Sequence, residues 1–197
     1  MTNQLPAARS AATVARYRSE YHDLLVRDIA PFWLRHGIDR RYGGLGNILD
    51  DAGRTVGHDK YLWSQGRALW TFSALWNRVA RRPAWLAAAR HVFQYLVDHG
   101  RDSRGRWMFR LDAAGKVCER DTSIYVDGFV LHGLGEYYRA TGSAVARRMA
   151  LATADSICER LANPGSYRVA PFVIPRCLKT HGINMIFSSF LFTAGRI

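Results

Sequence analysis

The stretch KYLWSQGRALWTFSALWNRV, residues 60–79, carries the pattern that decides the fold. Its apolar residues recur every three or four positions, which predicts an amphipathic helix over about residues 60–80. One end of that helix is unusual, because Trp63, Gln65 and Arg67 stand within five residues of one another. A helix that only packs in a core needs no amide and guanidinium there. We therefore expect this end to face a site and the rest to pack.

Similar helical patterns occupy most of the remaining chain. Pro83 and Gly100 mark the start and the stop of one of them, as proline and glycine commonly do. Pro31 lies inside another and is expected to kink or restart it. The predicted helices span 12–36, 60–80, 83–100, 122–142, 143–163 and 179–197.

Two long connections separate the helices. Each contains a tight turn, DDAG at 50–53 and DAAG at 112–115, between short extended segments, which predicts a β-hairpin. Antiparallel helix pairs whose long loops leave from one end are typical of a helical solenoid or a closed α/α toroid. We therefore predict an all-α fold whose loops build a site on one rim.

Length and composition restrict the class of protein. The 197 residues suit a single domain over 1–197. The net charge is +12, but the basic residues are scattered rather than arranged as a stripe, so we expect no nucleic-acid partner. No apolar run approaches the roughly 18 residues of a membrane span. The N-terminal residues also lack the apolar centre of a secretory signal, so we expect no membrane association and a cytoplasmic location. The three cysteines have no metal-ligand spacing, so we expect no metal site.

Three further motifs accompany the 60–79 stretch: YGGLGNILDDAGR at 42–54, RGRW at 104–107 and SIYVDGFVLHGLGEYYRATG at 123–142. Together these segments resemble the N-acylglucosamine 2-epimerase family over roughly residues 25–190. Gln65, which precedes Gly-Arg in the 60–79 stretch, makes the chain look closer to the N-acylglucosamine epimerases than to the cellobiose 2-epimerases.

The resemblance implies an (α/α)6 barrel, a toroid of six helical hairpins. It also implies epimerisation or aldose–ketose isomerisation at C2 of a free reducing sugar such as N-acetylglucosamine, N-acetylmannosamine or mannose. In the family two histidines act as acid and base through an enediolate. No metal or redox cofactor takes part, and some members respond to a nucleotide such as ATP as an effector.

The chemistry that the resemblance implies suits particular residues. An enediolate carries charge on oxygen, and a fixed cation aimed at that oxygen stabilises it strongly. Arg67 fits this catalytic role, since its guanidinium is always charged and forked. Trp63, one helical turn earlier, is a candidate sugar-stacking wall. The other candidate substrate-binding residues are Gln65, Tyr125 and His181.

Each of these residues also has a structural interpretation. Arg67 could be a surface arginine or an ion-pair partner, and Trp63 could be a core aromatic. Gln65 could bond loop backbone, and His181 could bond its own loop at a helix start. Tyr125 could point its hydroxyl into the bowl of the toroid, while Asp127 nearby is expected to bond a helix end or an arginine.

One departure from the family pattern affects the functional prediction. About six helices are expected here, whereas the family barrel has twelve, so the chain resembles its N-terminal half. We expect the histidine acid–base pair to be missing and the chain to be truncated or to form a homodimer. Catalysis by this chain alone is then in doubt. The alternatives are a non-enzymatic helical binding or oligomerisation module and an α/α-toroid glycoside hydrolase, although no convincing carboxylate pair is visible.

Overall fold

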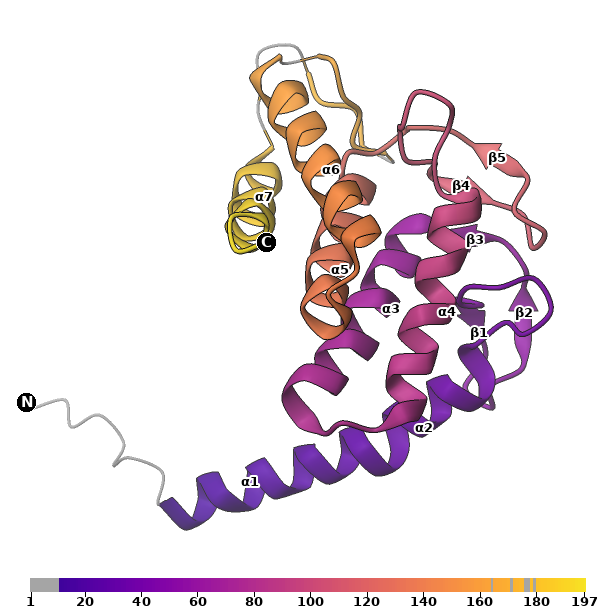
Figure 1. Ribbon diagram of the computed structural model, residues 1–197, viewed down its shortest axis with the longest axis vertical. Coiled ribbons are helices and arrows are strands. Elements are labelled where there is room, and N and C mark those ends of the chain that lie inside the picture. Colours follow the sequence, from indigo (N-terminus) through magenta and orange to yellow (C-terminus); the bar gives the residue numbers. More distant parts are fainter. Residues whose placement is uncertain (1–10, 164, 171, 176–177, 179) are drawn as a thin grey trace, which may run out of the picture.

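The chain begins with one long helical rod. The computed structural model describes residues 11–197 except 164, 171, 176–177 and 179. The rod runs through four consecutive segments (Figure 1), two of them π-helical: α1 (Ala11–Leu24), η1 (Leu25–Ile29), α2 (Ala30–Phe32) and η2 (Trp33–Gly37).

This rod does not break at Pro31. Ile29 and Phe32, on either side of the proline, keep right-handed helical backbone with φ of −61° and −56°. Proline has no N–H and its ring crowds the carbonyl four residues earlier, so the regular ladder cannot continue. The Ala30 amide instead donates to the Leu25 carbonyl, five residues back. The predicted interruption is therefore a local widening of a continuous helix.

Five further segments of regular helix follow, close to the predicted ranges. They form two helical hairpins and one additional helix. Their bounds are α3 (Leu62–Ala74) with its π-helical extension η3 (Leu75–Val79), α4 (Pro83–His99), α5 (Tyr125–Thr141), α6 (Ala144–Ala162) and α7 (His181–Ala194).

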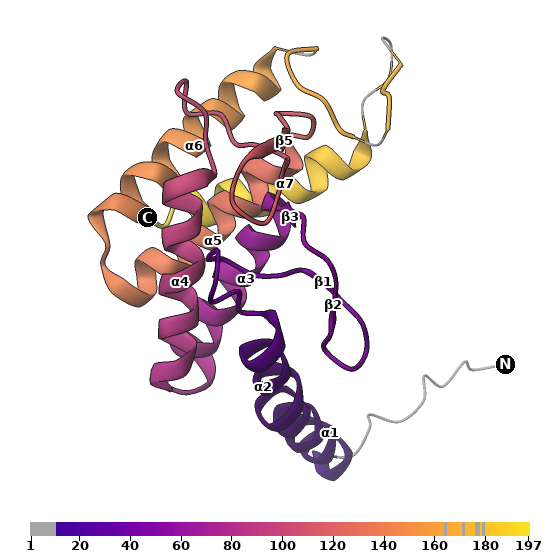
Figure 2. The same cartoon turned by 90° about the vertical axis from the view of Figure 1, so that its right-hand side faces the viewer.

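Helix α5 is the centre of the array. It packs against α3, α6 and α7, while α4 packs on α3 (Figures 1 and 2). The short links at 80–82 and 142–143 make α3–α4 and α5–α6 helical hairpins. The all-α class and the helical hairpins predicted from the sequence are confirmed. Among the residues that the structure describes, no helix combines the length and apolarity that crossing a bilayer requires.

Two glycines set the close contact between α3 and α5. A Cβ atom on Gly66 would lie 2.7 Å from the carbonyl carbon and oxygen of Phe129, and one on Gly133 would lie 2.5 Å from the Gly66 carbonyl oxygen. A side chain on either residue would separate the two backbones. The glycine in the sequence WSQGR is therefore a packing requirement, and it brings Arg67 next to Phe129.

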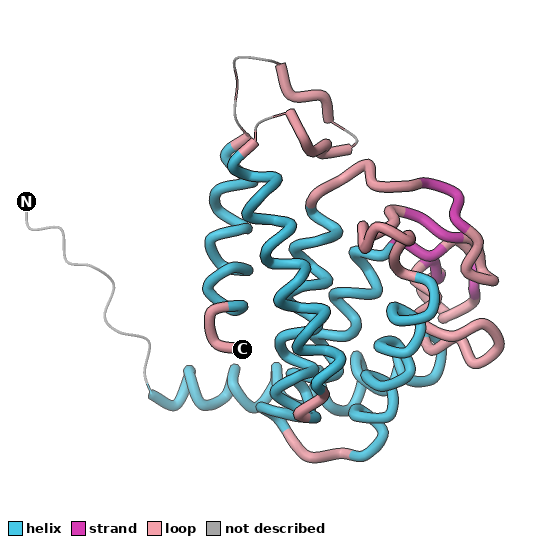
Figure 3. Tube along the Cα trace, turned by 45° about the horizontal axis from the view of Figure 1, so that its top comes forward, coloured by secondary structure: helices cyan, strands magenta, loops and turns pink. Residues whose placement is uncertain are grey.

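The long loops gather at one end of the helices, where they carry short strands (Figure 3). The two predicted hairpins are present. In the first, β1 (Ile48–Leu49) pairs antiparallel with β2 (Thr55–Gly57). In the second, β4 (Arg110–Leu111) pairs antiparallel with β5 (Val117–Glu119), and β3 (Lys60–Tyr61) adds a third strand beside β4. Residues 60–61 are thus a strand, although the sequence pattern placed them in the helix.

Lys60 ties the loops together. Its side chain is 1% exposed, and its Nζ lies 2.7 Å from Asp39 Oδ2. It also donates to the carbonyls of Gly43, at 2.7 Å, and Ala113, at 3.1 Å. All three ammonium donors are used, as a buried lysine requires. The strand position of Lys60 therefore follows from tertiary contacts rather than from local propensity.

Helix α1 differs from the others because none of its residues is buried. Its tyrosines and leucine recur at helical spacing, as expected, but Tyr17, Tyr21 and Leu24 are exposed. The apolar face of α1 therefore has no partner among the described residues.

Candidate functional site

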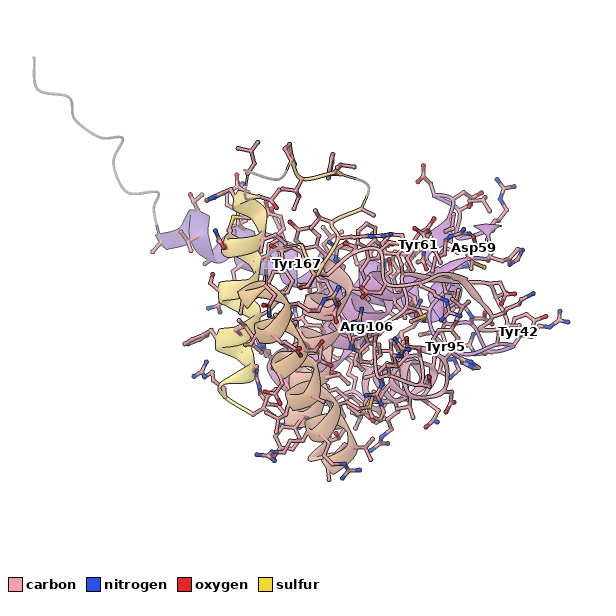
Figure 4. All side chains as sticks on the ribbon, turned by 90° about the horizontal axis from the view of Figure 1, so that it is seen from above. Tyr42, Asp59, Tyr61, Tyr95, Arg106 and Tyr167 are labelled. Carbon is pink, nitrogen blue, oxygen red and sulfur yellow. The ribbon has the colours of Figure 1, made fainter. Side chains whose placement is uncertain are left out.

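The candidate residues lie near the N-terminal ends of three neighbouring helices. Trp63 is the second residue of α3, while Tyr125 and His181 are the first residues of α5 and α7. Since α3 packs on α5 and α5 on α7, these helix starts share the loop end of the molecule. Figure 4 views the molecule from above and labels Tyr61 and Tyr167. The structure thus brings to one rim residues that are up to about 120 positions apart in the sequence.

Arg67 lies one turn inside α3 and is exposed. Its guanidinium carbon is 4.0 Å from the centroid of the Phe129 ring and 6.0 Å from that of Trp63. No acidic side chain pairs with Arg67 among the described residues. Its guanidinium lies against the faces of aromatic rings instead, and such rings stabilise a cation without neutralising it.

A pocket of about 260 Å³ opens beside Arg67, between the N-terminal helical rod and α3. Its walls are mainly apolar and include Trp33 and Phe72. Besides Arg67, the polar side chains that line it are Asn47, Ser64 and Thr71. A mostly apolar cavity with a few polar groups and one free cation is the usual form of a small-molecule site.

Trp63 packs among aromatic side chains, as its structural interpretation expected, and its role as a sugar-stacking wall stays a prediction. It is half-buried and packs its ring against Tyr61 and Phe109, with centroids 6.3 and 5.4 Å away. These three aromatic rings form one cluster at the start of α3. Its other neighbour is the Arg67 guanidinium, so Trp63 anchors the cluster and fixes the space available to that side chain.

Of the two roles considered for Gln65, a sugar contact and a bond to loop backbone, the structure shows the bond to loop backbone. Its side chain is fully buried. Its Nε2 donates to the Leu45 carbonyl and its Oε1 accepts from the Leu45 amide, both at 2.7 Å. Because both ends of the amide are occupied by the backbone of the 43–47 loop, a direct sugar contact from Gln65 is not supported. The residue positions that loop over α3.

The Tyr125 hydroxyl lies close to Gly182, the residue after His181. A Cβ atom on Gly182 would lie 2.9 Å from the Tyr125 hydroxyl oxygen. Burial raises the pKa of Tyr125, and the neighbouring Tyr167 raises it further, so the hydroxyl stays protonated and can donate a hydrogen bond. His181 is exposed at the start of α7. The two side chains are thus separate from the pocket beside Arg67.

The sequence pattern missed Phe129, Asn47 and Ser64. Phe129 lies four residues after Tyr125, on the same face of α5, so helical spacing could have identified it. Asn47 belongs to a loop, and no periodicity connects it to α3. Only the fold places it beside Arg67.

His132 lies one turn further along α5 than Phe129. Its ring stacks on Trp70 at 5.1 Å between centroids and also contacts Phe190. Burial lowers the pKa of His132, with Arg139 and Arg78 acting in the same direction and Glu136 opposing them. The ring is therefore neutral at pH 7, and it packs among aromatic side chains.

Comparison with known proteins identifies the relatives of this arrangement. A cellobiose 2-epimerase of Bacteroides fragilis is 32% identical over 127 residues, which are 64% of this chain and 32% of that protein. The human N-acylglucosamine 2-epimerase is 27% identical over 165 residues, 80% of this chain and 38% of that protein. The chain thus spans about a third of the length of these relatives.

The solved structures agree in fold. A cellobiose 2-epimerase from Spirochaeta thermophila superposes with a TM-score of 0.80 and 26% identity, covering 94% of this chain and 50% of that one. A D-mannose isomerase gives a TM-score of 0.73 at 18% identity, covering 98% and 48%, which shows the likeness of fold alone. The arrangement therefore corresponds to about half of such an (α/α)6 barrel.

The family model described as N-acylglucosamine 2-epimerase (GlcNAc 2-epimerase) matches residues 43–170, well over half of the chain. This range includes the Gln65 loop contact, the glycine crossing and the free guanidinium of Arg67. The chain therefore belongs to the N-acylglucosamine 2-epimerase family.

Proposed function

We propose that this chain contributes the sugar-binding and charge-stabilising part of a sugar 2-epimerase or aldose–ketose isomerase site. The observation that carries the proposal is the free guanidinium of Arg67, which lines a pocket and has no acidic partner among the described residues. A cation that is held in place but not neutralised is available to a developing oxyanion.

The reaction consistent with this site removes the proton from C2 of an open-chain sugar and returns it on the opposite face or at C1. The intermediate enediolate places negative charge on oxygen. Arg67 would hold that oxygen through its forked N–H groups. The Phe129 ring, 4.0 Å from the guanidinium carbon, helps to position this exposed side chain.

The substrate class follows from the relatives, which are named for N-acylglucosamine and cellobiose. We propose a free reducing sugar of the N-acetylglucosamine, N-acetylmannosamine or mannose type. We also propose that the acid–base histidine pair is not supplied by this chain. Sugar binding would then occur without turnover at C2.

The test follows both binding and chemistry. The 197-residue chain is incubated with each sugar in D2O while ¹H NMR records the C2 proton, and calorimetry measures the affinity. We expect binding without exchange. Arg67→Met should weaken binding by about tenfold or more, since hydrogen bonds to a charged group are lost. Arg148→Met, an exposed arginine on α6, is the matched control.

Each outcome has a clear meaning. Exchange at C2 that depends on Arg67 would support the epimerase function and overturn the missing acid–base pair. Neither binding nor exchange with any of these sugars would overturn the proposed function itself.

A second candidate function, a non-enzymatic oligomerisation module, is supported by the exposed apolar face of α1. Val14, Tyr17, Tyr21 and Leu24 lie at helical spacing on it. Such a patch is typical of a protein–protein contact. This candidate predicts a homodimer without sugar affinity, and analytical ultracentrifugation with and without Tyr21→Ser measures it directly.

A further inference from the structure

A second hollow lies at the loop end of the molecule, apart from the pocket beside Arg67. It has a volume of about 690 Å³ and is bounded by the 102–106 loop, residues 120–121, the C-terminal end of α6 and residues 165–168. Two of its lining residues, Arg106 and Tyr167, are labelled in Figure 4. None of its described lining residues lines the pocket beside Arg67.

The lining of this hollow is strongly basic. It contains five arginines and two aspartates: Arg104, Arg106, Arg120, Arg160, Arg168, Asp102 and Asp121. The three segments that supply exposed arginines surround the hollow instead of forming a line along one helix. A concave surface on which one sign of charge predominates concentrates the field and attracts counter-charges.

Part of this charge is already neutralised inside the protein. Arg160 places Nη2 2.8 Å from Asp121 Oδ1 and Nη1 3.0 Å from Asp127 Oδ2. Arg106 approaches the other oxygen of Asp121 at 3.4 Å. The carboxylate of Asp102 accepts from the backbone amides of Arg104 and Arg106, and so stabilises its own turn.

The remaining guanidinium groups are free. Arg104, Arg120 and Arg168 are exposed, and none of them pairs with an acidic side chain among the described residues. Beneath them the Arg160 side chain is only 8% exposed, and its Nε is buried without a hydrogen-bond partner. Since that nitrogen is buried and the terminal nitrogens of Arg160 pair with Asp121 and Asp127, the donors available to a ligand in the hollow are those of the three exposed arginines.

We propose that this hollow binds a phosphate-bearing small molecule. A phosphate group carries nearly two negative charges at neutral pH, and arginine forks bind its oxygens two at a time. Three free arginines match that charge better than they match a single carboxylate. The half-buried Tyr167 at the edge offers an aromatic face to an organic part of the ligand, such as a sugar ring.

The ligand source is either inorganic phosphate or a phosphate ester. Calorimetric titration of the 197-residue chain with orthophosphate, pyrophosphate and a hexose 6-phosphate, at constant ionic strength set with chloride, compares them. We expect saturable binding that chloride does not reproduce. Tighter binding of the hexose 6-phosphate than of orthophosphate, lost in Tyr167→Ala, would identify an ester. Equal binding would identify the inorganic ion.

The arginine variants test the location. R104Q/R120Q/R168Q should weaken pyrophosphate binding by at least about tenfold, because several charge-assisted contacts are removed together. The control R18Q/R35Q/R148Q removes the same net charge from exposed arginines outside the hollow and should bind as the unaltered chain does. Circular dichroism establishes that both variants fold.

Equal weakening in the two triple variants would mean that the overall charge attracts the anion, and the proposal would be overturned. Absence of saturable binding to all three phosphates would overturn it as well. R120K/R168K retains charge but loses the forks, so an intermediate affinity would support recognition of phosphate oxygens by the guanidinium groups. Since these variants leave Arg67 and its pocket intact, sugar binding at that site is measured independently.

Discussion

In α3 and α5, residues at helical spacing are buried against each other, and glycines bring the two backbones into contact. In α1 the same spacing leaves Tyr17, Tyr21 and Leu24 exposed, and the helix carries ion pairs such as Arg16–Glu20 on its surface. Periodicity therefore identifies a helical face but not whether anything covers it. Substitutions in the buried helices around α3 and α5 should change the stability strongly, whereas substitutions on the exposed face of α1 should not.

The largest expected effect is a pH dependence of the stability, which arises in the buried helix α5. Burial raises the pKa of Asp127 on α5 to about 7, with Asp121 raising it further and Arg160 opposing. Since this folded-state pKa lies above the ordinary Asp value of 3.8, ionisation of Asp127 weakens the fold as pH rises from about 4 to about 7. Each pH unit within that window changes the free energy of unfolding by at most about 1.4 kcal/mol.

Asp127→Asn isolates this effect, because asparagine resembles the protonated carboxyl. We expect the variant to gain stability relative to the unaltered chain as pH rises through that window, measured by urea unfolding at pH 4, 5.5 and 7. A difference that is constant with pH would contradict the raised pKa.

Lys60→Met should have the next largest effect. It removes the buried ammonium that joins Asp39, Gly43 and Ala113, and leaves the Asp39 carboxylate without its partner. Breaking such a pair costs about 3 kcal/mol, since the remaining charge is partly buried. Thermal unfolding measures the loss. Lys116→Met, an exposed lysine in the β4–β5 turn, is the control and should change little.

Gly66→Ala tests the helix crossing. The new methyl group would meet Phe129 backbone atoms at 2.7 Å, and backbone cannot move aside as a flexible side chain can. Overpacking of this kind costs about 2 kcal/mol. Gly105→Ala provides a contrast, because a Cβ there meets no atom within 4 Å and its cost arises only from the positive φ of 79°. Equal melting temperatures for Gly66→Ala and the unaltered chain would contradict the close crossing.

The smallest effect is expected on α1. Tyr21 is 67% exposed, so Tyr21→Ser should change the free energy of unfolding by no more than about 0.5 kcal/mol. Unfolding at several protein concentrations provides the check. A loss above about 1 kcal/mol that grows with protein concentration would show that the face of α1 is covered by a second copy in solution.

Much of the helical framework could be predicted from the sequence, because the spacing of apolar residues and the positions of Pro83 and Gly100 are local signals. The β-hairpins could be predicted from their turn residues for the same reason. The residue at which α3 begins could not be predicted from such local signals. Residues 60–61 pair with β4, a strand that lies some 50 positions away in the chain.

The candidate site shows the same division. The sequence by itself determined the helices, their hairpins and the family motifs, including the Gln65–Arg67 segment. Only the tertiary structure decided that Gln65 is enclosed by the Leu45 backbone while Arg67 remains free. The physical reason is that hydrogen-bond saturation and charge pairing depend on which distant segments meet. That outcome depends on close contacts such as Gly66–Gly133, which no local pattern encodes.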